Sequence, residues 1–293
     1  MYKIAKFIII PSVLLLLITS AGIGDVKGPG TTGANFLKIG VGARACAMGG
    51  AFTALADDAT ALYWNPAGLA QIKRAELYAT YNSWFQGINQ GYVGLTFPFI
   101  GGKLALGANY VDMGKLEGRD NEGGLTGEFG ATDIQANLGY AVGNKFMIGF
   151  SAGAVQETLE SNTQTAFLGT AGILLKPDPH LSIGVSYQNL GENSGQTSLP
   201  QTLRGGIALK IGSIILSFDA VMPNDNDSYF CGGVEFPLGN FIALRGGYTT
   251  RNDAGQGYSA GVGINISGLS VDYAYVPYSD LGDTHRISLT MRW

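Results

Sequence analysis

The chain has 293 residues, of which 45 are Gly and 14% are charged, against roughly 25% charged residues in ordinary soluble domains. The net charge is −4 and no block of basic residues is present, which argues against a nucleic-acid partner. Gly and Pro together stay below the level that signals disorder, and Cys46 and Cys231 lie too far apart for a zinc or redox motif.

Residues 1–24 are typical of a secretory signal peptide. Lys3 and Lys6 give a positive start, an apolar run follows over residues 7–18, and small residues offer a cleavage position near Ala21. The apolar run is shorter than the roughly 20 residues that a transmembrane helix needs. We therefore expect a signal peptide, with an uncleaved membrane anchor as the alternative.

Residues 25–74 show no strand-like alternation and predict short helices and turns. Ala and Gly dominate residues 42–58, and the acidic pair at 57–58 is a helix-start or turn signal. Asn65 precedes Pro66, which holds it out of the helical conformation.

The charges of this segment allow two interpretations. Arg44 could form a charge latch with Asp57 and Asp58, either inside the segment or toward a surrounding wall. Alternatively, the two acids cap a helix and remain solvated.

From residue 75 to Trp293, polar and apolar residues alternate, which places one set of side chains on each face of a sheet. We count about 14 such segments, each near the roughly 9–11 residues that cross a bilayer as a tilted strand. They centre on residues 76–84, 89–98, 103–112, 130–141, 145–156, 164–175, 180–189, 201–210, 213–221, 228–236, 240–249, 257–266, 269–276 and 284–293.

The connections between these segments alternate in length. Short ones fall at 100–102, 143–144, 177–179, 211–212, 237–239 and 267–268, and longer polar ones at 113–129, 157–163, 190–200, 222–227, 250–256 and 277–283. Such sorting is typical of barrels with short periplasmic turns and longer outside loops. Residues 75–293 therefore predict an all-β membrane protein, a closed antiparallel β-barrel of about 14 strands in the lipid of a bacterial outer membrane.

A barrel of this size has a lumen that needs an occupant. About 14 strands enclose more space than the roughly eight-stranded barrels that wall side chains alone can fill. The small residues of 25–74 suit that space, and inward glycines let an internal element approach the wall. We predict an N-terminal luminal plug, and an apolar pocket lined by Met48, Phe52 or Leu55 would favour transport of hydrophobic small molecules.

Two further features leave alternatives open. Cys46 and Cys231 could bridge plug and wall in an oxidising periplasm or remain free thiols. Trp293 ends the last strand on its apolar face. It resembles the C-terminal signal read by the barrel-assembly machinery, or it is an interfacial aromatic residue.

Catalysis has little support in the sequence. His180 and His285 are the two histidines, and no Gly-x-Ser-x-Gly, His-Glu-x-x-His or phosphate-binding motif occurs. The acids Asp120, Glu122 and Glu128 fit no calcium-loop spacing. We expect no enzyme activity, no metal and no cofactor.

The plug segment carries a resemblance to a known family. The run FLKIGVGARACAMGGAF at 36–52, with ADD at 56–58 and YWNPAGL at 63–69, resembles the N-terminal signature of the PorV/PorQ family within the FadL-like outer-membrane group. The resemblance implies a plugged 14-stranded barrel. It also implies that Asn65, Pro66, Ala67 and Gly68 correspond to the FadL hatch motif and act as a gate hinge. The sequence alone equally allows a plain turn at these residues.

The resemblance also implies a function. PorV-like proteins act as accessories in type IX protein secretion or surface attachment, through contact with cargo proteins or secretion components. A second class is a FadL-like channel for hydrophobic small molecules, in which the plug shifts and strand irregularities release substrate sideways into lipid. A third class is a structural barrel without transport. The signature favours the first class, and the barrel does not separate the first two.

Overall fold

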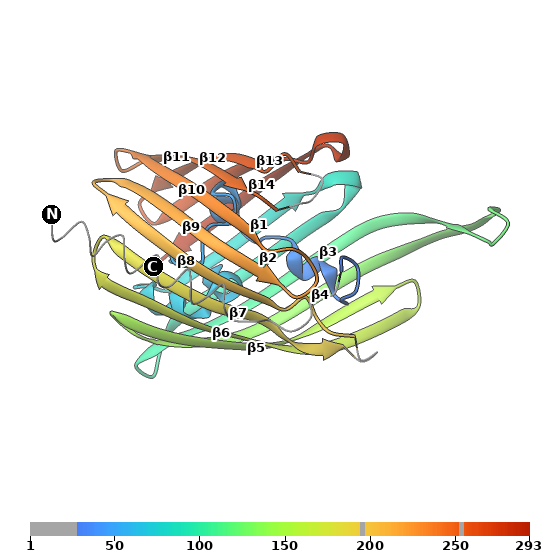
Figure 1. Ribbon diagram of the computed structural model, residues 1–293, viewed down its shortest axis with the longest axis horizontal. Coiled ribbons are helices and arrows are strands. Elements are labelled where there is room, and N and C mark those ends of the chain that lie inside the picture. Colours follow the sequence, from blue (N-terminus) through green and yellow to red (C-terminus); the bar gives the residue numbers. More distant parts are fainter. Residues whose placement is uncertain (1–27, 194–196, 252–254) are drawn as a thin grey trace.

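The computed structural model describes residues 28–193, 197–251 and 255–293, so the predicted signal peptide at 1–24 lies outside the described residues. An N-terminal segment with short helices is followed by strands that run to the end of the chain (Figure 1). Within the described residues, no helix combines the length and hydrophobicity needed to cross a membrane.

The strands form one closed antiparallel barrel in which each strand pairs with the next. β1 also pairs with β14, in register from Glu76 opposite Arg292 to Ser83 opposite His285, and this pairing closes the sheet. The predicted fold of about 14 strands is confirmed. The strands are β1 (Glu76–Ser83), β2 (Asn89–Phe99), β3 (Gly102–Arg119), β4 (Leu125–Gly143), β5 (Phe146–Leu159), β6 (Asn162–Asp178), β7 (Leu181–Asn193), β8 (Thr202–Ile211), β9 (Ile214–Pro223), β10 (Tyr229–Leu238), β11 (Ile242–Thr249), β12 (Tyr258–Ile266), β13 (Leu269–Pro277) and β14 (Asp283–Arg292).

Two predicted loops are strands instead. β3 and β4 pair through most of 113–129, with Leu116 opposite Phe129, and β5 and β6 pair through most of 157–163. The polar composition of these segments predicts loops. However, two paired strands that extend into water satisfy their backbone hydrogen bonds as fully as a solvated loop does. Lys115 and Glu128 add a cross-strand ion pair of 2.9 Å. The green β3–β4 hairpin projects beyond the neighbouring loops (Figure 1).

The two faces of the barrel wall differ in polarity. Along β14, Ile287, Leu289 and Met291 are exposed on the outside, whereas Arg286 and Ser288 are buried toward the lumen. The same division holds for the exposed aromatic and aliphatic side chains of the other strands. An apolar exterior around a polar lumen is the arrangement that lipid requires.

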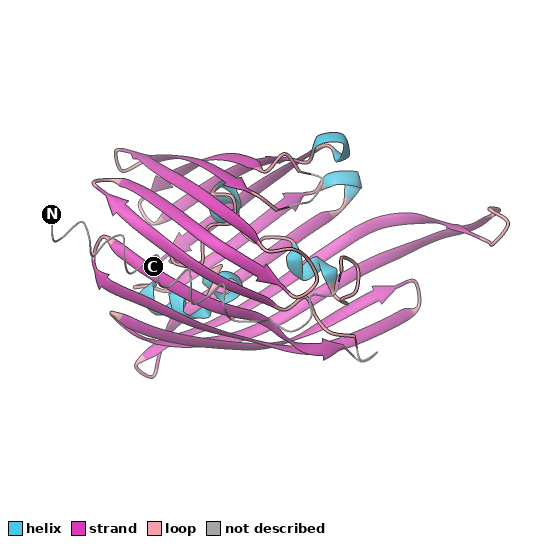
Figure 2. Cartoon of the chain, viewed as in Figure 1, coloured by secondary structure: helices cyan, strands magenta, loops and turns pink. Residues whose placement is uncertain are grey.

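The N-terminal segment lies inside the barrel, where its helices are surrounded by strands (Figure 2). Its elements are η1 (Asn35–Lys38), α2 (Ala43–Ala47), α3 (Ala61–Trp64) and η2 (Pro66–Gln71). Phe36 and Leu37 of η1 pack at the loop end, whereas Ala67 of η2 packs on Met147 near the short turns. Two further 3₁₀ turns, η3 (Phe85–Gly87) and η4 (Ser279–Leu281), belong to the loops.

Glycines of the wall let this plug approach closely. At each of a set of lumen-facing positions, which we call the glycine ring, an added Cβ would meet plug atoms. At Gly233, for example, it would stand 2.6 Å from the Met48 carbonyl oxygen and 2.7 Å from Met48 Cβ. The glycine ring comprises Gly94, Gly107, Gly139, Gly149, Gly172, Gly184, Gly206, Gly233, Gly247 and Gly261.

Candidate functional site

Arg44 of α2 joins the plug to the wall. Its Nε and Nη2 donate to the two carboxylate oxygens of Glu235 on β10, at 2.7 and 3.1 Å, and its Nη1 donates to Asp57. Glu235 also accepts from Arg245 at 2.6 Å, and Arg245 in turn reaches Asp272 at 2.7 Å. The latch geometry is therefore present between Arg44 and Asp57, and it extends into a chain of charges on the wall.

Asp58 has a different role from Asp57. Its Oδ1 accepts hydrogen bonds from the backbone N–H of Thr60, at 2.9 Å, and from the Thr60 hydroxyl, which caps the turn before α3. Burial, and then the nearby Glu76 carboxylate, raise the pKa of Asp58 to about 7. Asp57 therefore forms the ion pair with Arg44, whereas Asp58 is buried and stabilises the turn before α3 without capping the helix itself.

The predicted hatch motif occupies a tight position between plug and wall. Asn65 Nδ2 donates to the Thr53 carbonyl at 2.9 Å and to the Ile173 carbonyl of β6 at 3.2 Å, and Asn65 Oδ1 accepts from Ala67 N–H at 3.1 Å. Pro66 opens η2, and an added Cβ at Gly68 would overlap the carbonyl group of Ala56. The motif thus fixes a turn in place, and whether it moves as a hinge stays a prediction.

A second charged anchor was not identified from the sequence. Asp219 of β9 accepts from the backbone N–H of Phe52 and Thr53, at 3.1 and 3.0 Å, and pairs with Arg204 of β8 at 3.1 Å. The Arg204 guanidinium lies 4.9 Å from the Trp64 ring centroid, within cation–π range. The alternation of polar and apolar residues puts Arg204 and Asp219 on the polar face of their strands, but nothing in their spacing identifies their partners on the plug.

The three residues proposed to line an apolar pocket pack in the closed interior of the plug. Met48 and Phe52 are fully buried, and Leu55 nearly so, within one cluster that also contains Leu62 and Trp64. None of the three lines either of the two cavities described next.

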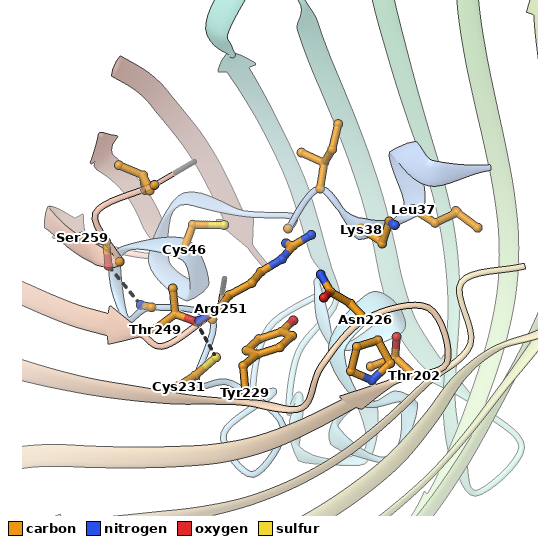
Figure 3. Close-up of a pocket in the computed structure, with 18 of the residues that line it drawn as sticks. Leu37, Lys38, Cys46, Thr202, Asn226, Tyr229, Cys231, Thr249, Arg251 and Ser259 are labelled. Carbon is orange, nitrogen blue, oxygen red and sulfur yellow. Dashed lines mark hydrogen bonds between the residues drawn. The ribbon is translucent and has the colours of Figure 1, made fainter. Parts of the chain in front are cut away.

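A cavity of about 390 Å³ lies in the lumen at the loop end, between the plug and strands β7 to β14. We call it the loop-end cavity. Arg251 and Tyr229 point into it from the wall, toward the plug segment that carries Cys46 and Lys38 (Figure 3). Its lining includes Lys38, Cys46, Tyr63, Trp64, Trp84, Arg204, Asp225, Tyr229, Cys231, Thr249, Arg251, Ser259 and Arg286.

A second cavity of about 240 Å³ lies at the end of the barrel with the short turns, and we call it the turn-end cavity. Arg44 and Asp58 line it from the plug, and Glu235, Arg245 and Asp272 line it from the wall. Its lining therefore includes the charge chain that holds α2.

Cys46 and Cys231 are free thiols, and both line the loop-end cavity. The Cys231 thiol donates to the Thr249 hydroxyl at 3.6 Å, a bond drawn in Figure 3. Burial raises the pKa of the Cys46 thiol, which favours its neutral form. Plug and wall are thus joined here by packing and polar contacts, without a disulfide.

Trp293 is exposed on the outside of the barrel, and its backbone N–H donates to the Ala75 carbonyl at 3.2 Å. Both interpretations of this residue, an assembly signal and an interfacial aromatic, are compatible with that position. Its recognition by the assembly machinery stays a prediction.

Solved structures with a similar fold include a toluene transporter and a hydrocarbon channel. The toluene transporter TodX of P. putida matches with a TM-score of 0.65 at 12% identity, over 87% of this chain and 99% of that one. The monoaromatic hydrocarbon channel CymD matches with a TM-score of 0.60 at 14% identity, over 87% and 98%. A Pseudomonas aeruginosa FadL homologue matches with a TM-score of 0.54 at 13% identity, over 85% and 97%. These likenesses establish a shared fold.

No curated protein matches the sequence. The FadL-type fold expected from the plug signature is thus found, while membership of the PorV/PorQ family stays a prediction. The chain belongs to the uncharacterised protein family UPF0164, whose model matches residues 18–193, more than half of its length.

Proposed function

We propose that the protein is an outer-membrane channel that takes up small, largely apolar molecules, with residues 25–74 as its plug. The observation that carries the proposal is the pair of cavities on opposite sides of the plug. Both adjoin strands β10 to β14, so they are two ends of one interrupted path along the same part of the wall. The proposal agrees with the channel function of the similar structures TodX and CymD.

The barrier between the two cavities is thin. On β10, Cys231 lines the loop-end cavity and Glu235 lines the turn-end cavity. Four positions at roughly 3.3 Å per residue separate them by about 13 Å. Between them lies Gly233 of the glycine ring, in contact with Met48. The two cavities would therefore join if the segment around α2 left this stretch of the wall.

That segment is held by bonds that can be exchanged with water. Ser259 of β12 donates to the Ala47 carbonyl at 3.0 Å and accepts from Gly49 N–H at 3.1 Å. The Ala43 N–H donates to Ser288 at 2.8 Å, and Arg44 adds its ion pairs. Water can replace each of these partners, which it cannot do for an apolar contact.

The loop-end cavity suits molecules with an apolar body. Tyr63, Trp64 and Tyr229 present rings to it, and a volume of about 390 Å³ falls within the range of small-molecule sites. An aromatic or short aliphatic compound would lose water-exposed apolar area there.

Uptake of radiolabelled toluene by a Gram-negative host tests the proposal. Expression of the full chain should raise the initial uptake rate. Asn226→Trp, which fills the mouth of the loop-end cavity, should remove most of that gain, whereas Ser228→Trp, exposed and outside the cavity lining, should keep it. An uptake rate unchanged by expression, or equal in the two variants, would refute the channel.

The secretion-accessory role is the second candidate, and the projecting β3–β4 hairpin favours it. Leu116 and Leu125 are exposed near its tip and offer apolar contact area to a protein partner. Crosslinking in native membranes would support this role if it recovered secreted proteins or secretion components and if a shortened hairpin lost them. Recovery of neither would exclude it.

A further inference from the structure

Arg286 of β14 is a buried cation with no counter-ion among the described residues. The residue is 3% exposed and lines the loop-end cavity. Within the described part of the chain its side chain forms no ion pair or hydrogen bond, and its Nε is buried without an acceptor. Lys38 and Arg204, which line the same cavity, are paired with Asp225 and Asp219. A lone buried guanidinium is costly, so its presence indicates a ligand that supplies the missing charge.

A second donor beside it also lacks an acceptor. Trp84 lines the same cavity, and its Nε1 is buried without a partner in the described residues. Asn82 is the register partner of Arg286 across the β1–β14 pair, and Trp84 follows Asn82 by two residues. Asn82 Oδ1 is an available acceptor nearby, but a neutral amide oxygen cannot balance the charge of a guanidinium.

The charge around the cavity is unbalanced in the same sense. Lys38 is balanced by Asp225 and Arg204 by Asp219, whereas Arg286 has no carboxylate partner among the described residues. A planar guanidinium binds a carboxylate through two parallel N–H···O bonds, and the Trp84 N–H can add a third.

Aromatic rings stand beside these donors at the mouth of the cavity. The Trp84 and Phe85 ring centroids are 4.2 Å apart, and Phe85 lies 5.1 Å from Tyr278. All three residues line the cavity, on the loops that follow β1 and precede β14. A flat apolar body bound next to Arg286 would therefore pack on rings.

We infer that the loop-end cavity binds small aromatic carboxylates, with the carboxylate on Arg286 and the Trp84 N–H and the ring among Trp84, Phe85 and Tyr278. This inference rests on the proposed function, because it names the class of molecule that the channel accepts.

Calorimetric titration of the purified, detergent-solubilised full chain with benzoate and with benzamide tests the inference, because the two probes share size and ring and differ in charge. Benzoate should bind at least about tenfold more tightly, as expected for a charge-assisted bidentate contact. Arg286→Gln should abolish that preference and Arg286→Lys should retain part of it. Equal binding of the two probes, or a preference unchanged in Arg286→Gln, would overturn the inference.

Thermal unfolding without ligand separates a binding role from a structural one. Removal of an unpaired buried charge should leave the unfolding temperature of Arg286→Gln equal to or above that of the wild type. Arg204→Gln, which breaks the pair with Asp219, should lower it and serves as the matched control. A drop in Arg286→Gln like that in Arg204→Gln would assign Arg286 a structural partner and overturn the inference.

The two proposals fail separately. Toluene uptake that depends on the loop-end cavity, without a benzoate preference, would overturn the carboxylate site and leave the channel standing. Benzoate binding that depends on Arg286, without any uptake, would support the site and refute the channel.

Discussion

Two neighbouring glycines of β11 offer a direct test of how the plug is held. Gly247 belongs to the glycine ring, and an added Cβ would stand 2.7 Å from Gly49 Cα and closer still to Gly49 N. Gly246 faces the other side of the sheet, where an added Cβ would meet Val234 Cγ1 at 3.8 Å, an ordinary contact. Gly247→Ala should therefore displace the plug around α2, whereas Gly246→Ala should not.

The expected magnitude follows from these contacts. A Gly→Ala change at a compatible strand position stabilises a protein by about 0.4–1 kcal/mol, because it restricts the unfolded chain. Overpacking costs about 1–3 kcal/mol, and the upper end applies to Gly247 because the opposing atoms are backbone and cannot rotate away. The two variants should thus differ by about 3 kcal/mol, which is roughly a 100-fold change in the ratio of docked to undocked plug.

Hydrogen–deuterium exchange of the purified protein in detergent measures this ratio locally. Peptides covering residues 43–56 should exchange faster in Gly247→Ala than in Gly246→Ala, while peptides of β4 to β6 stay unchanged as an internal reference. The pair Gly233→Ala and Gly232→Ala should repeat the result on β10, since Gly233 contacts Met48 and Gly232 meets Phe218 at 3.5 Å. Equal exchange in both members of each pair would refute close plug–wall packing at the glycine ring.

Three more predictions concern single side chains of the plug. Arg44→Met should weaken plug docking by about 2 kcal/mol, which is less than the cost of leaving a buried carboxylate without any partner, because Glu235 still pairs with Arg245. Faster proteolysis of the plug would show this loss. Asn65→Ala should cost about 3 kcal/mol, since it leaves the buried carbonyls of Thr53 and Ile173 without their side-chain donor, and the thermal midpoint would report the loss. The pKa of Asp58 is raised to about 7 in the folded protein, so the folded state binds the proton more tightly than the unfolded chain does. The stability that this proton contributes is therefore lost as the pH rises from 3.8, the ordinary pKa, through 7. The thermal midpoint of the wild type should therefore fall relative to that of Asp58→Asn between about pH 5 and pH 8, and parallel curves would contradict this.

The barrel could be predicted from the sequence because its signal is repeated and local. Arg286, Ser288 and Thr290 interleave with Ile287 and Leu289, and one buried face fixes such a strand without knowledge of its neighbours. Loop boundaries were less certain, because pairing can extend through polar residues. At Lys115 and Glu128 the strands continue as a polar ladder in water, where composition alone suggests a loop.

The site could be predicted only in part, because partners across the lumen leave no trace in sequence spacing. Arg44 and Asp57 are close in sequence and were considered together, whereas Glu235 lies far along the chain on β10 and was not connected with them. The same holds for Asp219, whose partners Phe52 and Thr53 are on the plug. Arg286 lacks an ion-pair partner among the described residues because of how the strands around the cavity are assembled. The sequence pattern of one strand therefore cannot predict it.

The two sides of the plug differ in how much of their contact with the wall is polar, and this difference indicates where a path would open. Toward β3 to β6, Leu62 and Leu69 pack on Gly139, and Ala67 packs on Met147 and Leu174. Toward β10 to β14, Ala47 packs on Ala274 and Met48 packs on Gly233, and ion pairs and hydrogen bonds, among them Arg44 with Glu235, add to this packing. Separation of the apolar side exposes surface to water without compensation, whereas the polar side exchanges its partners for water at small net cost. Movement of the plug should therefore begin at α2, and the loop-end and turn-end cavities lie on that side of the barrel.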